Sequence, residues 1–255
     1  HVGNYLALNH KLDRYIETVA STINLVKANK RSKHQVYISF DEWNVWYHSN
    51  AQDRAVLEGN SGWPHAPRLL EDIYNFEDVL QVGCILNTFI RKSNVVKIAC
   101  IAQLVNVIAP IMTEPGGAAW RQTIYYPYYF ASIFGRGVAL NLAVKCPGYD
   151  ADVADNVPYL DIAGTHDAEA GTVTFFAVNR HPTEDLTPEI ALHGFGDLQV
   201  IDHQVMTHAN LSAVNSLSAQ ATVTPAKGKG AKIDNGRLTL ALKPHSYTMI
   251  RLGRR

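Results

Sequence analysis

Cysteine is scarce in this sequence, with only Cys84, Cys100 and Cys146 in 255 residues. They are widely spaced and form no Cys-x-x-Cys pair, so neither a disulfide framework nor a thiolate metal site is expected. Cys84 and Cys100 lie in apolar segments, which is typical of core cysteines. Sparse, unpaired cysteines favour a reducing compartment, and we therefore expect a cytoplasmic protein.

The chain also lacks an excess of charge of either sign, because 23 Lys and Arg residues balance 23 Asp and Glu residues. A neutral chain has no positive surface for a phosphate backbone, so no nucleic-acid partner is expected. Long apolar runs are missing as well: the best candidate, residues 95–112, is interrupted by Lys97, Gln103 and Asn106. A membrane span needs roughly 18 apolar residues in succession, so no membrane partner is expected.

The first half of the chain alternates between helical and extended patterns. Apolar residues recur at helical spacing over residues 4–29 and 70–91, which predicts two amphipathic helices. Residues 35–40 and 95–107 predict two strands, and the stretch up to about Arg68 predicts irregular structure. An aromatic group from Trp120 to Phe130 follows the second strand. The order helix, strand, helix, strand, helix is typical of a parallel α/β barrel or sheet.

The second half consists of short alternating runs between turn signals. The runs at residues 171–178, 198–206, 237–242 and 247–252 predict strands. Strands at this density, with no convincing helix, indicate an antiparallel β-sandwich. We therefore expect part of an α/β domain over residues 1–135 and a β-sandwich domain over residues 136–255.

The segment Asp41-Glu42-Trp43-Asn44 stands where a predicted strand ends and a loop begins. In a parallel α/β barrel, functional side chains project from such strand ends. A carboxylate at this point can attack an anomeric carbon, and the aromatic faces of Trp43, Trp46 and Tyr47 can pack against a sugar ring. The alternative is an ion-paired carboxylate beside ordinary core aromatics. The residues alone leave both interpretations open.

The run ISFDEWNVWY at residues 38–47 resembles the nucleophile segment of the α-L-arabinofuranosidases of glycoside hydrolase family 51. Further segments resemble the same family in the same order: NYLAL (4–8), LEDIYNFED (70–78), KIACIAQLVNV (97–107), IMTE (111–114), WRQTIYYP (120–127) and, more loosely, KPHSY (243–247). The resemblance implies a retaining enzyme that releases terminal arabinofuranosyl residues from arabinose-containing oligosaccharides or hemicellulose fragments.

The resemblance also implies roles for three side chains. Glu42 matches the nucleophile, Trp46 an aromatic residue that shapes substrate recognition, and Gln103 a side chain that binds the sugar near the nucleophile. For Gln103, the residues alone leave open a polar side chain that is satisfied inside a buried strand. The implied chemistry requires no metal and no organic cofactor. We also expect a homo-oligomer.

The fold implied by the resemblance is a β/α barrel with an accompanying β-sandwich. The expected fold class is therefore α/β plus all-β: a partial TIM (β/α)8 barrel with its last two βα units, followed by an antiparallel jelly-roll-like β-sandwich. A barrel needs eight βα units and about 250 residues, whereas about 135 residues precede the sandwich here. We expect the earlier units to lie on a second chain, to have been lost, or to belong to a larger protein of which this sequence is a piece.

A retaining glycosidase also needs a second carboxyl group, about 5–5.5 Å from the nucleophile, as acid and base. In family 51 this glutamate directly follows an asparagine, and no Asn-Glu dipeptide occurs in this chain. Glu114 is a candidate substitute in the loop after the second strand, although support of that loop is the better interpretation. Asp41 is a poor partner for Glu42 because neighbours on a strand point to opposite faces.

Weaker features favour structural roles. His166-Asp167-Ala168-Glu169 indicates exposed polar residues in a turn, and His203 and His208 lack a third ligand at metal spacing. The tyrosines from Tyr125 to Tyr129 are predicted to begin a helix that packs on the barrel, and this is favoured over a role in binding sugar.

Two rival functions remain. The first is a non-catalytic sugar-binding or structural remnant, which the missing acid/base favours if the chain acts alone. The second is a different retaining glycosidase, such as an endoglucanase.

Overall fold

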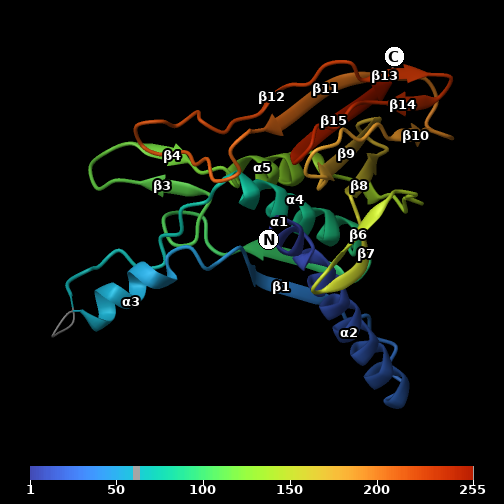
Figure 1. The fold of residues 1–255 in the computed structure, drawn as a ribbon. Helices are drawn as coiled ribbons and strands as arrows, with labels where there is room; N and C mark the ends of the chain where they lie inside the picture. The colour runs from blue at the N-terminus through green and yellow to red at the C-terminus, as the bar shows by residue number, and fades with distance from the viewer. Residues whose placement is uncertain (60–63, 255) are drawn as a thin grey trace.

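The computed structural model describes residues 1–59 and 64–254. Most helices and a pair of parallel strands lie on one side of the molecule, and the two larger antiparallel sheets lie on the other (Figure 1). Helix α4 (Phe76–Arg91) lies between the two sides and is buried along most of its length. The sheets are mostly antiparallel, as the second half of the sequence predicts.

Most elements predicted in the first half are present. Besides α4, this half contains α1 (Val2–Leu6), α2 (Leu8–Asn29), β1 (Ile38–Trp43), α3 (Asn50–Glu58), β2 (Val96–Ile101), β3 (Ile111–Thr113), β4 (Ala119–Arg121) and α5 (Tyr125–Phe134). The helix predicted over residues 4–29 is confirmed as α1 and α2, which meet at Ala7. The two strands are confirmed as β1 and β2, although β2 ends at Ile101 and not near residue 107.

Two expectations for this half are wrong. The stretch expected to be irregular contains α3, and residues 60–63 of that stretch lie outside the described residues. The second helix begins at Phe76 and not at residue 70, because Asn75 and Asp78 form a reciprocal capping box. Each side chain accepts a hydrogen bond from the other's backbone N–H, at 3.1 and 2.8 Å. These bonds satisfy donors that a helix start leaves without intrahelical partners, which sets the first residue of α4.

β1 and β2 pair in parallel, with Phe40 opposite Ala99 and Trp43 opposite Ile101. The register shifts between Phe40 and Trp43, so both aromatic rings pack on Phe89 of α4, with ring centroids 5.3 Å apart in each case. Within the described residues no further strand pairs with β1 or β2. The two strands are therefore covered on the α4 side and open at both outer edges.

The second half forms two antiparallel sheets that share a core and, in addition, a separate antiparallel pair of strands, Gly148–Ala151 with Ala154–Pro158. Its strands are β5 (Val138–Ala139), β6 (Gly148–Ala151), β7 (Ala154–Pro158), β8 (Leu160–Asp167), β9 (Thr172–Asn179), β10 (Glu189–Ala191), β11 (Leu198–Thr207), β12 (Ala226–Lys227), β13 (Lys232–Asp234), β14 (Arg237–Thr239) and β15 (Ser246–Arg254). The larger sheet has the order β12-β11-β15-β9-β8-β5, and the smaller has the order β10-β14-β13. Phe175 of β9 and Leu238 of β14 lie in the apolar cluster between them. The strands predicted in this half are confirmed, although the one predicted at residues 237–242 ends at Thr239.

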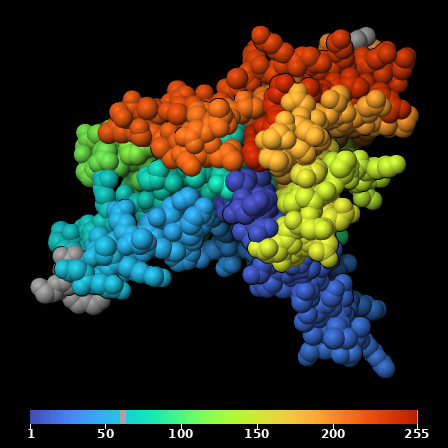
Figure 2. Space-filling view, in the orientation of Figure 1, coloured from blue at the N-terminus to red at the C-terminus, as the bar shows by residue number. Residues whose placement is uncertain are grey.

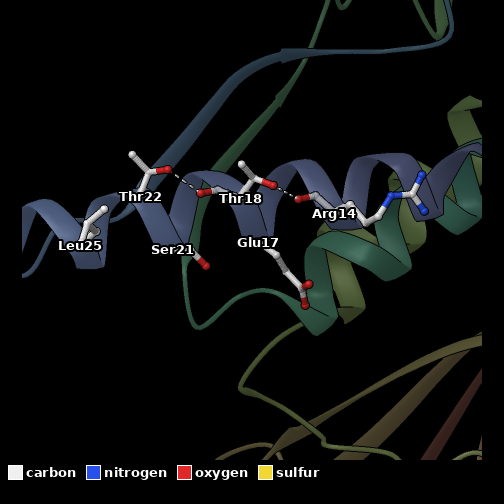
Figure 3. A pocket seen from close by; sticks show the side chains of 6 residues that line it. All are labelled: Arg14, Glu17, Thr18, Ser21, Thr22 and Leu25. Carbon is white, nitrogen blue, oxygen red and sulfur yellow. Dashed lines mark hydrogen bonds between the residues drawn. The ribbon is translucent and has the colours of Figure 1, made fainter.

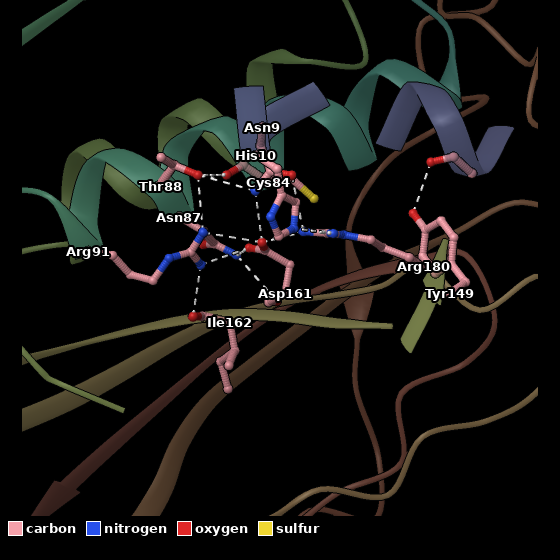
Figure 4. Close-up of polar contacts among 11 residues, drawn as sticks. Asn9, His10, Cys84, Asn87, Thr88, Arg91, Tyr149, Asp161, Ile162 and Arg180 are labelled. Carbon is pink, nitrogen blue, oxygen red and sulfur yellow. Dashed lines mark hydrogen bonds and ion pairs between the residues drawn. The ribbon is translucent and has the colours of Figure 1, made fainter. Parts of the chain in front are cut away.

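A buried polar network joins the helices to the larger sheet (Figure 4). The Asp161 carboxylate of β8 forms ion pairs with Arg91 of α4, at 3.0 Å, and with Arg180, which follows β9. It also accepts hydrogen bonds from the side-chain amides of Asn9, at 3.0 Å, and Asn87, at 2.8 Å. Burial alone would raise the pKa of Asp161, but the charges of Arg91 and Arg180 outweigh it and hold that pKa below its usual value. One buried carboxylate thus fixes the helical half against the sheet.

Helix α2 projects from the body of the molecule (Figure 2). Its predicted apolar face is only partly covered: Ile16 is buried, whereas Leu8 is 38% and Val26 46% exposed. An open groove on this helix is lined by Leu25 and polar residues (Figure 3), and the Thr18 and Thr22 hydroxyls there donate to backbone carbonyls one turn earlier. In the described ranges, no helix combines the length and apolarity needed to cross a membrane.

Candidate active site

Glu42 lies next to the last residue of β1, and its side chain is exposed. Phe40 and Trp43, on either side of it, pack toward α4 instead. Within the described part of the chain, no cation lies within ion-pair distance of the Glu42 carboxylate. The alternative of an ion-paired carboxylate is therefore wrong, and Glu42 is open to a ligand.

Gln103 follows the end of β2 and is exposed. The two strand ends are joined by hydrogen bonds, because the Ala102 N–H donates to the Trp43 carbonyl and the Asn44 side-chain amide donates to the Ala102 carbonyl, both at 3.0 Å. Gln103 is therefore not enclosed in a buried strand, so that alternative is wrong. The structure brings Gln103 to the same end of the two-stranded sheet as Glu42.

The aromatic residues after Glu42 lie in different environments. Trp43 is 7% exposed and packs on Phe89, so the expectation that it can pack against a sugar is wrong. Trp46 is 56% exposed and Tyr47 is 46% exposed. Trp46 and Tyr47 are therefore the aromatic residues of this segment that a ligand can reach.

Two buried side chains hold the backbone on either side of Trp46. The Tyr74 hydroxyl donates to the Val45 carbonyl at 2.8 Å, and the Asp72 carboxylate accepts from the Tyr47 backbone N–H at 3.0 Å. Asp72 and Tyr74 are both 0% exposed. The sequence indicates no role for either residue, and the only signal is their place in the run LEDIYNFED.

His48 is a further polar residue of this region that the sequence does not single out. Its Nε2 lies 2.8 Å from one oxygen of Asp78, and the Tyr5 hydroxyl donates to the other oxygen at 2.6 Å. Burial lowers the pKa of His48, but the hydrogen bond and charge of Asp78, with Asp72 beyond, outweigh it and raise that pKa above the usual 6.5. Burial and the charge of Asp78 also raise the pKa of Tyr47 to about 12. The segment after Trp46 is therefore anchored to the start of α4 through a charged group.

Glu114, the candidate substitute for the acid/base, pairs with the Arg68 guanidinium through both carboxylate oxygens, one of them 3.1 Å from Nη1. The hydrogen bond from Arg68 lowers the pKa of Glu114. A general acid must hold its proton near the working pH, which requires a raised pKa. The pair therefore suits Glu114 to joining two loops and not to donating a proton.

The weaker candidates have structural contacts. In the turn after β8, the Asp167 carboxylate accepts hydrogen bonds from the backbone N–H groups of Glu169 and Ala170, at 3.1 and 3.0 Å. No group of three His, Cys, Asp or Glu side chains in the described ranges is placed to hold a metal ion. Tyr126 and Tyr128 of α5 pack against apolar clusters, which agrees with a structural role for this aromatic segment.

The fold and the site define a class of protein in which an α/β unit with an exposed carboxylate at a strand end is joined to antiparallel sheets. Residues 41–246 match the family described as the alpha-L-arabinofuranosidase C-terminal domain. The chain belongs to this family, and the resemblance to family 51 α-L-arabinofuranosidases is confirmed.

Curated relatives match the chain over nearly its whole length. It is 50% identical over 254 residues to the intracellular exo-alpha-(1->5)-L-arabinofuranosidase of Halalkalibacterium halodurans, with 100% of this chain and 50% of the relative covered. It is 46% identical over 252 residues to intracellular exo-alpha-(1->5)-L-arabinofuranosidase 1 of Bacillus subtilis, with 99% and 49% covered. The chain thus spans about half the length of the curated relatives it matches.

Solved structures show the same relationship. A family 51 alpha-L-arabinofuranosidase from Bifidobacterium longum has a TM-score of 0.89 at 32% identity, with 98% of this chain and 49% of that chain covered. An alpha-L-arabinofuranosidase from Thermotoga maritima, solved with arabinose, has a TM-score of 0.80 at 20% identity, with 98% and 50% covered. The second likeness is one of fold alone.

Proposed function

We propose that this chain supplies the nucleophile side of the active site of a retaining α-L-arabinofuranosidase. The observation that carries the proposal is the exposed Glu42, free of ion pairs within the described residues, at the same sheet end as exposed Gln103. Trp46, four residues after Glu42, is 56% exposed and offers an aromatic face. The names of the curated relatives support a terminal arabinofuranosyl residue as the group released.

In the proposed reaction, the Glu42 carboxylate attacks the anomeric carbon while an acid protonates the departing oxygen. The bond to the leaving group breaks and a glycosyl ester of Glu42 forms. The same acid group, now a base, then takes a proton from water, which hydrolyses the ester and frees Glu42. The Gln103 amide binds sugar hydroxyl groups and the Trp46 ring packs against the sugar. Neither step requires a metal or an organic cofactor.

We propose that the acid/base glutamate comes from polypeptide outside these 255 residues. Glu114 is paired with Arg68, and the chain contains no Asn-Glu dipeptide. The open edges of β1 and β2, and Ile98 at 53% exposure on β2, support a further segment that completes the sheet there. This segment, on the same chain or on a second one, would carry the earlier barrel units.

The domain interpretation follows from the same proposal. Residues 1–135 are the last two βα units of a β/α barrel, and residues 136–255 are a jelly-roll-like β-sandwich whose larger sheet packs on α4. The word intracellular in the names of relatives supports a cytoplasmic setting. The exposed apolar residues of α2 support contact with further protein, including other copies of this chain in a homo-oligomer. Light scattering would measure the oligomeric state.

The test is hydrolysis of 4-nitrophenyl α-L-arabinofuranoside by the chain alone and with any polypeptide that co-purifies with it. Glu42→Ala should lower the rate by at least about a thousandfold, because the covalent route is lost. Added azide should restore turnover in Glu42→Ala and yield the glycosyl azide of inverted configuration, since azide attacks directly where Glu42 stood. Glu169→Ala is the matched control, an exposed carboxylate in the turn between β8 and β9, and should retain activity.

Three outcomes separate this proposal from its rivals. Activity that survives Glu42→Ala would show that Glu42 is not the nucleophile. Equal rates on glucosides and arabinofuranosides would favour an endoglucanase-like enzyme instead. Binding of L-arabinose without hydrolysis, both alone and with the co-purifying polypeptide, would identify a non-catalytic sugar-binding remnant.

A further inference from the structure

The backbone N–H groups of the segment that follows Trp46 are held by one buried carboxylate, that of Asp72. Asp72 accepts hydrogen bonds from three successive backbone N–H groups, those of Tyr47 at 3.0 Å, His48 at 3.1 Å and Ser49 at 2.9 Å. Hydrogen bonds to an ionised carboxylate are about twice as strong as those between neutral groups. Asp72 is 0% exposed, so it cannot touch a sugar at the surface. Its bonds act only on the backbone of this segment.

The segment that precedes Trp46 is held from the same stretch of chain. The Tyr74 hydroxyl donates to the Val45 carbonyl at 2.8 Å. Gln122 supports this arrangement, because its side-chain oxygen accepts from the Tyr74 N–H at 3.0 Å and its amide nitrogen donates to the Asp72 carbonyl at 2.9 Å. Gln122 is itself 0% exposed. Asp72 and Tyr74 therefore form a rigid support that is fixed from behind.

Trp46 combines a fixed backbone with a side chain that is 56% exposed. Ordinary surface loops must be ordered when a ligand binds, and this ordering weakens binding. A backbone that is already hydrogen-bonded on both sides of the aromatic residue avoids most of that cost. The arrangement is one that a sugar-binding aromatic residue requires.

We propose that Asp72 and Tyr74 are positioning residues of the sugar site, which hold Trp46 in its binding position through the backbone of residues 45–49. The inference rests on the proposed function, since it assigns the purpose of the support to sugar binding. Both residues act through Trp46 and neither contacts the ligand. A support that served only the start of α3, at Asn50, would leave sugar affinity unchanged when weakened.

The test uses ¹⁵N-labelled full chain, with any co-purifying polypeptide, and follows the indole N–H signals of its tryptophans. Trp46→Phe assigns the Trp46 signal. Asp72→Asn keeps the shape of the side chain but replaces one accepting oxygen by an NH₂ group, which cannot accept. We expect a lower ¹H–¹⁵N NOE at Trp46 and an affinity for L-arabinose that is about tenfold weaker, as the loss of one charge-assisted hydrogen bond would give. The signals of Trp43 and Trp120, both in the core, should stay in place.

The matched control is Asp53→Asn. Asp53 is also a buried carboxylate, in the first turn of α3, but it accepts from the Ser49 hydroxyl and the Leu70 N–H and not from residues 47 and 48. The Asp53→Asn substitution should leave the Trp46 NOE and the arabinose affinity unchanged. Equal effects of Asp53→Asn and Asp72→Asn would overturn the inference, because general loosening of α3 would then explain both.

A second variant keeps the proposal testable if Asp72→Asn does not fold. Tyr74→Phe removes only the hydroxyl that donates to Val45, and it should also lower the Trp46 NOE and the arabinose affinity. An unchanged NOE in the folded variants overturns the inference even if the proposed function holds. Failure of the wild-type protein to bind L-arabinose counts against the proposed function instead, and the ligand-free NOE still decides whether the support exists.

Discussion

The side-chain amide of Asn44 donates a hydrogen bond to the backbone carbonyl of Ala102 at 3.0 Å, and so links the end of β1 to the end of β2. The same amide also donates to the Ile108 carbonyl. Asn44 lies two residues after Glu42, and Ala102 directly precedes Gln103. The alignment of the proposed nucleophile with the proposed sugar-binding amide therefore depends on this asparagine side chain together with the backbone bond from the Ala102 N–H to the Trp43 carbonyl.

Asn44→Ala should weaken both the fold and the site. It leaves the Ala102 carbonyl without the Asn44 donor, whereas the Ile108 carbonyl keeps the Gln103 backbone N–H, and we expect the free energy of unfolding to fall by about 1–3 kcal/mol. Gln103 should lose its alignment with Glu42, which lowers the affinity for L-arabinose. Urea denaturation and arabinose titration measure the two effects. Asn94→Ala changes an exposed asparagine and should alter neither, and unchanged stability of Asn44→Ala would contradict the prediction.

Asp161→Ala should be among the most destabilising substitutions in the chain. It leaves Arg180, whose side chain is 1% exposed, without its counter-ion. Removing one partner of a buried ion pair lowers the free energy of unfolding by about 3–5 kcal/mol. The control is Asp185→Ala, which breaks the pair of Asp185 with Lys243, where the side chains are 42% and 63% exposed. An exposed pair contributes about 0–1 kcal/mol, so equal losses in urea denaturation would refute the assignment of Asp161.

The pair of His48 and Asp78 predicts a pH-dependent part of the stability. The pKa of His48 is raised in the folded protein, so this stabilisation is fully present below the usual pKa of 6.5. It is lost as the pH rises through the raised, folded-state pKa. The difference in unfolding free energy between wild type and His48→Gln should therefore shrink as the pH rises from below 6.5 through the raised pKa. An NMR titration that places the pKa of His48 at or below 6.5, or one that Asp78→Asn does not lower, would count against the pair.

Gly83→Ala should destabilise the contact between α4 and the larger sheet. A Cβ atom at this position would lie 2.8 Å from the Tyr247 ring and 3.0 Å from a Val178 methyl group. Both neighbours are at most 1% exposed, so neither can move away freely. We expect the free energy of unfolding, measured by thermal denaturation, to fall by about 1–3 kcal/mol, although alanine favours a helix more than glycine does. Ser21→Ala on the exposed side of α2 is the control and should change stability by less than about 0.5 kcal/mol.

Glu114→Gln tests whether a second carboxyl group is present in this chain. Loss of a general acid/base lowers the rate by about a hundredfold or more. Because Glu114 is paired with Arg68, we expect Glu114→Gln to lower the rate of hydrolysis of the nitrophenyl substrate far less than this. The rate is measured with the chain alone or with its co-purifying polypeptide, whichever is active. A loss of that size, together with rescue by azide to a product of retained configuration, would identify Glu114 as the acid/base after all.

Several features could be predicted from the chain because they depend on neighbouring residues. The 3.6-residue spacing of apolar side chains indicates α2 and α4, and alternation with period two indicates β9, β11 and β15. The run from Asp41 to Tyr47 indicates a sugar hydrolase by resemblance. The start of α4 was missed although its signal is local: Asn75 and Asp78 have capping-box spacing, with Asp in place of the usual Glu or Gln.

Other features could not be predicted because their cause is distant. Helix α3 is only nine residues long, and the backbone just before it, at His48 and Ser49, is fixed by Asp72, more than twenty positions further along the chain. Trp43 looks like a sugar-binding residue next to Glu42, but the register shift in β1 turns it toward Phe89. The apolar stripe of α2 predicts a covered helix, yet much of it remains exposed in the described structure.

The sequence by itself determined the periodicity of the elements, the neutral charge, the three unpaired cysteines and the motif around Glu42. Only the tertiary structure decided that Glu42 is exposed at the same sheet end as Gln103, that Glu114 is bound by Arg68, and that Asp72 and Tyr74 bond to the backbone on either side of Trp46. The physical reason is the range of the forces involved. Secondary structure follows from side chains a few residues apart, whereas a hydrogen bond between Asp72 and His48 exists only after packing on α4 brings them together.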